Sequence, residues 1–398
     1  MATFSIRFLG CKVSHTDAQA LRERLLADGH VERADGADVA VVNTCCVTNE
    51  AVAKSRQAVA RAARGHGRVY VTGCAPNLGR AAFADVPAIA TLVTGRSEDV
   101  GDVVARDVGA IGCVQADARL DRIRAFVKVQ DGCSFSCNFC VIPLVRGSSR
   151  SRAAAAVLSE VEKRVRQGHR EIVLTGINLG CYRDRGAGYT LPRLVRAVGA
   201  LPGVLRLRLS SIEINHVDDD LIAALRETPA VARHLHVPLQ SGDDRVLREM
   251  GRRYTVATYL RRLQPLGDFN LTSDVIVGFP AEDDAAFERT LDVVRAARLT
   301  KVHVFPYSPR PGTRTEANDT VPPETKKERS ARLRALSHVA SLERWRSKLG
   351  RSDAVLVDRV GRGYGDDYSP WLVDSRAPVG RMLPVTAHAI TEEGIVAA

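Results

Sequence analysis

Short apolar runs alternate with amphipathic segments along the N-terminal part of the chain, and this alternation limits the fold most strongly. The apolar runs between residues 4 and 112 include SIRFLG, ADVAVVNT and RVYVTG, and segments such as TDAQALRERLLADG and NEAVAKSRQAVARAAR separate them. Strand and helix patterns that alternate in this way predict a small open parallel sheet wrapped by helices. We therefore expect an α/β fold here.

Each of these three apolar runs is followed by a cysteine, namely Cys11, Cys45 and Cys74. In open α/β sheets, ligands gather beyond the carboxyl ends of the strands. The three thiols are distant in sequence, but this geometry predicts that they converge at one edge of the sheet.

A second alternating series follows a polar joint near residues 117–121. The helical stretches in it include AAAAVLSEVEKRVRQG, DDLIAALRE, TVATYLRRLQPL and DDAAFERTLDVVRAARL, each with apolar residues at helical spacing. Six strands and intervening helices predict a partial parallel (β/α)6 barrel, with its chemistry at the C-terminal ends of the strands. The predicted strands are 125–129, 171–175, 205–210, 234–239, 272–277 and 301–306.

The end of the chain has a different pattern. A basic helix is expected after Pro322 and Pro323, and short valine-rich strands punctuated by glycine and proline follow from about residue 351. This pattern predicts a short C-terminal β-barrel module. The expected domains are residues 1–115 for the N-terminal sheet, 120–348 for the barrel and 349–398 for the small module.

The charge of the chain favours a polyanionic partner. Lysine and arginine total 57 against 46 acidic residues, which gives a net charge of +11. A high-GC genome that favours arginine is the alternative explanation, but residues 324–348 hold eight basic and three acidic residues. No signal peptide and no long apolar run is present, so we expect a cytoplasmic protein without a membrane span.

The nine cysteines are an odd number, and in the expected reducing compartment they favour metal ligation over disulfides. Cys133, Cys137 and Cys140 lie in DGCSFSCNFCVIP, with three and then two residues between them. Three such thiolates can hold three irons of a 4Fe–4S cluster and leave the fourth iron open. A structural zinc site is the alternative, but zinc normally needs a fourth ligand, and the next histidine, His169, lies beyond a predicted helix.

This spacing resembles the radical S-adenosylmethionine (SAM) superfamily, and CSFSCNFCVIPLVRGSSRSR is similar to its methylthiotransferases. Further blocks similar to that family occur in family order over nearly all of the chain. They are NTCCVTNEA, TGC, EIVLTGINLGCY, LRLSSIE, HLHVPLQSGDDRVLREMGRRYT, DVIVGFP and HVFPYSPRPGT.

The resemblance implies two 4Fe–4S clusters. Cys133, Cys137 and Cys140 would hold the catalytic cluster that cleaves SAM to a 5′-deoxyadenosyl radical. Cys11, Cys45 and Cys74 would hold the auxiliary cluster, whose open iron would carry the sulfur that is transferred. A methylthio group would then pass to C2 of an adenine in the tRNA anticodon stem-loop. An electron donor such as a flavodoxin or ferredoxin is implied, and we expect a monomer.

Side chains that follow the barrel strands are the expected SAM contacts, since chemistry lies at the carboxyl ends of such strands. Each could instead be a structural turn. Arg146, Arg150 and Arg152 are candidates to pair with the SAM carboxylate or an RNA phosphate. The expected contacts are Thr175, Gly176, Asn178, Ser211, Glu213, Gln240, Ser241, Val277 and Gly278.

Several positions remain open. Family members usually carry asparagine at the position of Ser14 and glutamine near Asn77, so the surroundings of the auxiliary cluster differ here. We expect Cys46 to pack in the core, because neighbouring residues on an extended segment point opposite ways, and Cys113 and Cys181 to be small buried residues.

The near-neutral C-terminal module shifts the expected RNA contacts to the helix 326–348. Aromatic residues that could stack on bases or form core are Trp345, Tyr364, Tyr368 and Trp371.

TGINLGCY and HVFPYSPRPGT are most similar to the branch of the family that acts on threonylcarbamoyladenosine next to the anticodon. The alternatives are the branch for isopentenyladenosine and the branch for an aspartate of a ribosomal protein. Two rivals of other classes are an RNA-binding protein with structural metal centres and a radical SAM enzyme for small molecules. The two separate cysteine trios disfavour the first, and the basic helix and extra N-terminal sheet disfavour the second.

Overall fold

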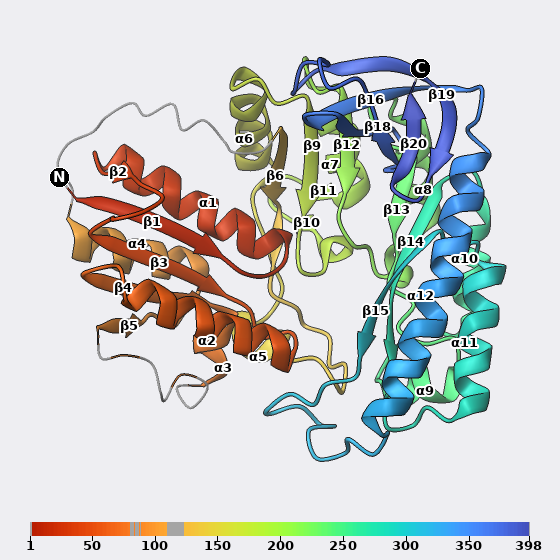
Figure 1. The fold of residues 1–398 in the computed structure, drawn as a ribbon, viewed down its shortest axis with the longest axis horizontal. Coiled ribbons are helices and arrows are strands. Elements are labelled where there is room, and N and C mark those ends of the chain that lie inside the picture. The colour runs from red at the N-terminus through yellow and green to blue at the C-terminus, as the bar shows by residue number, and fades with distance from the viewer. Residues whose placement is uncertain (1, 80–82, 84–86, 88, 110–122, 398) are drawn as a thin grey trace. The chain divides into compact units, whose positions relative to one another are not determined.

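The computed structural model describes residues 2–79, 83, 87, 89–109 and 123–397. They divide into two units, which Figure 1 draws and which are considered separately. The first unit comprises Met1–Arg119, Asp131–Arg150 and Ser308–Asn318. The second comprises Leu120–Gln130, Ser151–Tyr307 and Asp319–Ala398.

The first unit contains the predicted parallel sheet, with strand order β2-β1-β3-β4-β5. Alternate residues of β3 face two different cores. Val39 and Val41 pack with helices α1 (Lys12–Ala27) and α4 (Ser97–Val108), and Ala40 and Val42 pack with α2 (Asn49–Ala63). The sheet is therefore covered on both faces, as expected for parallel strands. Its strands are β1 (Thr3–Phe8), β2 (Val31–Glu32), β3 (Val39–Thr44), β4 (Arg68–Gly73) and β5 (Ala90–Leu92).

The helices of the first unit begin close to the carboxyl ends of these strands. Helix α2 is capped by Thr48, whose hydroxyl accepts a hydrogen bond from the amide of Ala51 at 3.1 Å. Short helix α3 begins at Cys74, and short helix α5 begins two residues after Cys140. The helices are α1 (Lys12–Ala27), α2 (Asn49–Ala63), α3 (Cys74–Leu78), α4 (Ser97–Val108) and α5 (Ile142–Arg146).

The second unit contains the six predicted barrel strands as two three-stranded parallel sheets, β6-β9-β12 and β13-β14-β15. A parallel bridge between Leu207 and Val231 and a hydrogen bond from the Ile212 amide to the His236 carbonyl (2.9 Å) join the sheets. Together they form an open partial barrel. The strands are β6 (Arg124–Lys128), β9 (Glu171–Thr175), β12 (Arg206–Leu209), β13 (His234–His236), β14 (Asn270–Val277) and β15 (Lys301–Pro306).

Strand boundaries differ from the sequence prediction by a few residues. Strand β13 ends at His236 rather than Leu239, because Pro238 has no amide hydrogen to donate to the ladder. Strand β14 begins two residues earlier than predicted, at Asn270. Short pairs that the sequence did not predict are β7 (Gln130–Asp131) with β8 (Arg150–Ser151), and β10 (Arg183–Asp184) with β11 (Tyr189–Thr190).

Helices that alternate with the strands cover the outer face of the partial barrel. Their apolar residues and one face of each strand form a single large core. No helix in the described part of the chain combines the length and apolar character that a membrane crossing needs. The helices are α6 (Ala154–Arg166), α7 (Leu191–Gly199), α8 (Asp219–Glu227), α9 (Asp244–Glu249), α10 (Val256–Leu263), α11 (Asp284–Ala296) and α12 (Pro323–Arg346), with 3-10 turns at Leu179–Cys181, Ile214–His216 and Gln264–Leu266.

The C-terminal module is a closed five-stranded barrel, as predicted, with strand order β16-β17-β18-β20-β19 and β16 paired to β19. Its small core contains Val355, Trp371, Ala387 and Ile395. The strands are β16 (Ser352–Arg359), β17 (Arg362–Tyr364), β18 (Pro370–Leu372), β19 (Met382–Thr391) and β20 (Gly394–Ala397).

A buried ion network holds this module at the amino-terminal end of the partial barrel. Glu171, the first residue of β9, is fully buried and pairs with Arg206 (3.3 Å) and Arg208 (2.9 Å). Both arginines also donate to the carbonyl oxygen of Gly365, at 3.2 Å from Arg206 and 2.7 Å from Arg208. The Asn270 side chain donates to the Asp367 carbonyl at 2.7 Å. Residues 364–368 therefore occupy that end of the strands.

We expect Glu171→Ala to destabilise the protein by about 3–5 kcal/mol, because two buried guanidinium groups lose their counter-charge. Burial alone would raise the pKa of Glu171, but Arg208, Arg206 and Arg124 outweigh it and hold the pKa below its ordinary value. The stabilisation is therefore present above about pH 4.3 and is lost as the pH falls through the folded-state pKa.

Urea denaturation at several pH values measures this effect. Glu227→Ala removes an exposed partner of Arg196 and serves as the matched control, with an expected loss below about 1 kcal/mol. Equal losses for the two variants would show that the Glu171 network does not hold the module.

Candidate functional site

The three cysteines that follow the N-terminal strands come together in the first unit. Cys11 is exposed before α1, whereas Cys45, after β3, and Cys74, the first residue of α3, are buried. Burial raises the pKa of the Cys45 thiol to about 11, and negative charge on Cys74 and Cys11 adds to that rise. The Cys45 thiol therefore lies within electrostatic range of the other two thiols, at the carboxyl edge of neighbouring strands.

The backbone before Cys74 requires glycine. Gly73 has a φ of +92°, and a Cβ atom there would lie 2.4 Å from Asn43 Oδ1 and 2.5 Å from the Thr44 carbonyl oxygen. Neighbouring strand β3 therefore approaches too closely for any side chain. This close approach turns the chain directly from β4 into α3 and places the Cys74 thiol.

Cys46 is fully buried, as expected, but it is not remote from the cysteine trio. Its thiol hydrogen-bonds Cys74, and this bond followed by burial raises the pKa of Cys46. The same bond and the guanidinium of Arg146 lower the pKa of Cys74 to about 7. Cys46 therefore packs in the core and also supports the anionic form of Cys74.

The second trio lies on the loop that precedes α5, also in the first unit. Cys133, Cys137 and Cys140 are all half-buried. The Cys133 amide donates to the Gly147 carbonyl at 3.0 Å, and the Cys140 amide donates to the Cys137 carbonyl at 3.1 Å. The loop is therefore folded back on itself, which holds three thiols in a short segment.

Arg146 connects the two trios. It is the last residue of α5, its side chain is 7% exposed, and its Nε donates to the Cys74 sulfur at 3.2 Å. Its other nitrogens pair with Asp131 (3.0 Å), two residues before Cys133, and with Asp17 (2.9 Å) of α1. Burial alone would lower the pKa of Arg146, but Cys74, Asp17 and Asp131 outweigh it and raise it. The guanidinium is therefore a permanent charge in the first unit.

Ser14 and Asn77, the two positions where the sequence departs from the family pattern, both lie beside this arginine. The Ser14 hydroxyl is 3.8 Å from the Cys11 sulfur and accepts a hydrogen bond from Arg146 at 3.4 Å. The Asn77 amide donates to the carbonyl groups of Val145 (2.9 Å) and Gly95 (2.8 Å). Both substituted side chains thus make contacts that hold the site.

Each trio supplies fewer ligands than a closed structural zinc site, which normally has four protein ligands. Three thiolates can hold three irons of a 4Fe–4S cluster and leave the fourth iron without a protein ligand. The donor set of each trio therefore matches the one that such a cluster requires.

The residues expected to bind SAM lie at the carboxyl ends of the barrel strands in the second unit. Thr175 ends β9 with a buried hydroxyl that has no hydrogen-bond partner among the described residues, and the Asn178 amide donates to Gln130 Oε1 at 2.8 Å. A Cβ on Gly176 would lie 3.0 Å from the same oxygen. Gln240 has a φ of +66°, and such strain in a residue other than glycine is typical of functional sites.

The other strand-end residues are tied more closely to the protein itself. Val277 is buried at the end of β14, and a Cβ on Gly278, whose φ is +71°, would lie 2.4 Å from Lys326 Cγ. Ser211 is half-buried, and Ser241 is buried with its hydroxyl bonded to the Asp243 amide (3.3 Å). Gly278 is thus needed for a close approach of helix α12.

Glu213 and the three arginines have partners inside the protein. Glu213 caps a 3-10 turn by accepting from the Asn215 amide at 2.9 Å, and it pairs with Arg252 at 3.2 Å. Arg150 donates to the carbonyl groups of Arg146 and Ser148. Arg152 pairs with Glu160 at 2.6 Å. These charges fix loops and a turn. A structural turn was the alternative interpretation for Glu213, whereas the internal partners of Arg150 and Arg152 were not predicted.

The aromatic residues near the C-terminus pack against other side chains of the protein and are buried or half-buried. Trp371 is fully buried, and Trp345 packs partly buried against the same core. Tyr368 stacks on His234 and on Tyr364 with ring centroids 5.0 and 5.1 Å apart. Of the two functions that the sequence left open, the structure supports packing.

Most charges of the basic helix are also neutralised within the protein. Lys326 and Arg329 are buried in ion pairs, and Arg332, Arg344 and Lys348 pair with nearby carboxylates. In the described part of the chain, Lys327, Arg334 and Arg346 are exposed and form no ion pair. The surface available to a polyanion is therefore much smaller than the sequence of residues 326–348 indicates.

Two further cysteines had been expected to be small buried residues. Cys113 lies outside the described residues. Cys181 is half-buried, and its sulfur lies 3.3 Å from His216 Nε2. The nearby Gly180 leaves room for the His216 ring, because a Cβ there would lie 2.4 Å from the histidine Cβ.

Sequence reasoning missed two groups of residues that the fold brings together. Asp17 and Asp131 bind Arg146 but belong to no spaced motif, so only the fold brings them together. His236, Asp274 and His303 form the single three-residue group of potential metal ligands in the described residues. A signal for this second group was present, since all three lie on predicted strands at positions that share one face.

Comparison with known proteins gives matches over the whole chain. A family model described as Radical SAM superfamily matches residues 127–294, and one described as Uncharacterized protein family UPF0004 matches residues 3–95. Threonylcarbamoyladenosine tRNA methylthiotransferase MtaB of Thermotoga maritima is 33% identical, with 100% of this chain and 96% of that protein covered. The Bacillus subtilis protein of the same name is 37% identical, with coverage of 85% and 80%.

A relative of another description matches nearly as well. The tRNA-2-methylthio-N(6)-dimethylallyladenosine synthase of Bifidobacterium longum subsp. infantis is 32% identical, with coverage of 98% and 88%. Among solved structures, the radical S-adenosylmethionine methyltransferase TsrM from Kitasatospora setae has a TM-score of 0.58 at 14% identity, with coverage of 79% of this chain and 75% of that chain. At this identity the structural likeness shows the fold alone.

We expect Arg146→Met to raise the pKa of the Cys74 thiol, because the guanidinium that stabilises the thiolate is lost. In cluster-free protein, alkylation of Cys74 by iodoacetamide, followed by mass spectrometry across pH, should shift from a midpoint of about 7 to a higher pH. Arg150→Met, in the same loop but bonded only to carbonyl groups, is the control. An unchanged midpoint in Arg146→Met would contradict this role.

We expect Gly73→Ala to cost about 1–3 kcal/mol of stability, because the added methyl group meets backbone atoms of β3 and alanine is strained at this φ. Gly101→Ala in helix α4 is the control, since a Cβ there meets no atom within 4 Å. Thermal unfolding compares the two. If both variants melted together, the close approach at Gly73 would not be needed for folding.

Proposed function

The chain belongs to the radical SAM family of tRNA methylthiotransferases, and from this membership we propose that it adds a methylthio group to C2 of N6-threonylcarbamoyladenosine next to the tRNA anticodon. The observation that carries the proposal is similarity along the full chain to relatives described as acting on threonylcarbamoyladenosine. The protein is a transferase that uses SAM and two 4Fe–4S clusters.

Both clusters would be held by residues of the first unit. We assign Cys133, Cys137 and Cys140 to the catalytic cluster and Cys11, Cys45 and Cys74 to the auxiliary cluster. When bound, these groups supply radical generation from SAM and the sulfur that is transferred. The domain boundaries that accompany this assignment are 1–115, 120–348 and 349–398.

The chain's own residues contribute charge balance and position. Arg146 offsets the negative charge of the Cys74 thiolate and fixes α1 and the loop before Cys133 through Asp17 and Asp131. Burial of Cys45 and Cys74 keeps water away from two of the three auxiliary ligands. Such preorganised contacts limit side reactions of a reactive centre.

SAM contacts are assigned to the carboxyl ends of the barrel strands. The buried hydroxyl of Thr175 and the strained backbone of Gln240 support this assignment. The strand-end geometry of (β/α) barrels supports the others. The assigned residues are Thr175, Gly176, Asn178, Ser211, Glu213, Gln240, Val277 and Gly278.

The partner proposed for this enzyme is the anticodon stem-loop of tRNA. The exposed charges of Lys327, Arg334 and Arg346 on helix α12 suit phosphate contacts. Reduction of the clusters requires an electron donor such as a flavodoxin or ferredoxin. We propose that the enzyme itself is a cytoplasmic monomer.

A second candidate substrate is isopentenyladenosine at the same tRNA position. The 32% identical Bifidobacterium relative, described as a dimethylallyladenosine synthase, supports it. The higher coverage of the Thermotoga relative, together with TGINLGCY and HVFPYSPRPGT, favours threonylcarbamoyladenosine.

Nucleoside analysis of tRNA from cells that lack the gene tests the substrate. Loss of 2-methylthio-N6-threonylcarbamoyladenosine, with other methylthio nucleosides retained, is expected. Its persistence would rule out this substrate, and loss of the isopentenyl derivative instead would establish the second candidate.

Iron analysis of anaerobically reconstituted protein tests the two-cluster assignment. About eight irons per chain are expected, and about four should remain in Cys45→Ala, which loses one auxiliary ligand. Cys181→Ala, outside both trios, is the control and should keep about eight. About four irons in the unaltered protein would remove the sulfur-donor role of the first trio.

A further inference from the structure

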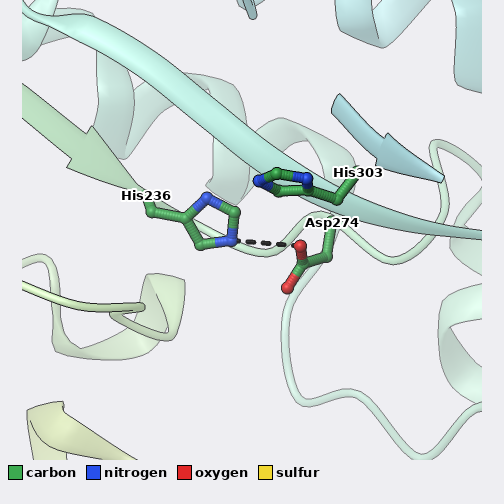
Figure 2. Close-up of side chains that lie close together, drawn as sticks. All are labelled: His236, Asp274 and His303. Carbon is green, nitrogen blue, oxygen red and sulfur yellow. Dashed lines mark ion pairs between the residues drawn. The ribbon is translucent and has the colours of Figure 1, made fainter. Parts of the chain in front are cut away.

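Two histidines and an aspartate converge on neighbouring strands of the second unit. Asp274 of β14 and His303 of β15 are directly paired across the parallel strands. His236, the last residue of β13, is paired with Thr272, two residues before Asp274. Because side chains alternate along a strand, all three point to the same face of the sheet, and Figure 2 shows them together.

This face is the inner surface of the partial barrel. The alternate residues Leu235, Val275 and Val302 point the other way, into the core beneath the helices. The side chain of His236 is 11% exposed, that of Asp274 is 26% exposed, and His303 is exposed. The group formed by His236, Asp274 and His303 is therefore accessible from the inner side of the barrel, although the side chain of His236 is nearly buried.

The ligand atoms of the three side chains lie within 4.8 Å of one another. His236 Nε2 is 3.2 Å from Asp274 Oδ1, and the rings of His236 and His303 have centroids 5.6 Å apart. A simple ion pair would need only His236 and Asp274. The third side chain makes the arrangement one that can surround a cation.

The Thr272 hydroxyl orients the ring of His236. Its oxygen lies 2.9 Å from His236 Nδ1, which leaves Nε2 directed towards Asp274. The same hydroxyl lies 3.0 Å from His234 Nε2. A hydrogen bond to the second ring nitrogen is the usual support of a histidine that ligates a metal.

We propose that His236, Asp274 and His303 bind a divalent first-row transition-metal ion. Two neutral imidazoles and one carboxylate match the ligands preferred by such ions, and the set is too rich in nitrogen to suit magnesium or calcium. Three protein ligands leave coordination positions open towards the inner surface of the barrel. The proposed site uses none of the six cluster cysteines and does not depend on the proposed RNA substrate.

Anaerobic equilibrium dialysis of cluster-loaded protein against Co2+, followed by cobalt and iron analysis, tests the proposal. The unaltered protein should bind one more Co2+ per chain than Asp274→Asn or His303→Ala, with the iron content unchanged. Thr272→Val keeps all ligands but removes the orienting hydroxyl, so its affinity should fall about 10–100-fold.

His338→Ala is the matched control, because His338 is an exposed histidine on α12 that pairs with Glu392 outside the site. It should retain the additional Co2+. Equal cobalt binding by unaltered protein and His303→Ala would overturn the proposal, and so would the absence of binding to unaltered protein. His303 is exposed, and its variant should melt like the parent, so loss of cobalt there cannot reflect unfolding. Failure of cobalt binding would leave tRNA modification and the iron count unaffected.

Discussion

Parallel pairing of strands is the constraint on which both sites depend. It brings the carboxyl ends of β1, β3 and β4 to one edge, and Cys11, Cys45 and Cys74 follow those ends. The same rule aligns β13, β14 and β15, so that residues 67 positions apart along the chain, His236 and His303, point to one face. The loops after the strands then need only a few residues with unusual backbone angles, such as Gly73, to place the thiols.

Electrostatic balance is the second requirement, because thiolates and carboxylates are costly to bury without a partner. One guanidinium, that of Arg146, offsets Cys74, Asp17 and Asp131 together. In the second unit, Glu171 does the opposite and offsets a pair of arginines. In each unit, a buried charge is therefore surrounded by groups of the opposite charge.

The sequence allowed prediction of the parts that follow from periodicity and spacing. All six barrel strands, the N-terminal sheet and the C-terminal barrel were found as predicted, because alternation of apolar residues reports burial directly. Partners of charged residues could not be predicted in this way. The residues that bind Arg146 are 15 and 129 positions away from it, and the ion pairs that neutralise α12 involve several separate elements. Such contacts depend on the completed fold rather than on any local pattern.

The C-terminal module closes one end of the partial barrel in the second unit. Residues 364–368 fill the amino-terminal end of the strands, held by Arg206, Arg208 and Asn270. The protein's own residues therefore keep a small molecule out of that end, and a molecule that reaches the inner face of the sheets must come by another route.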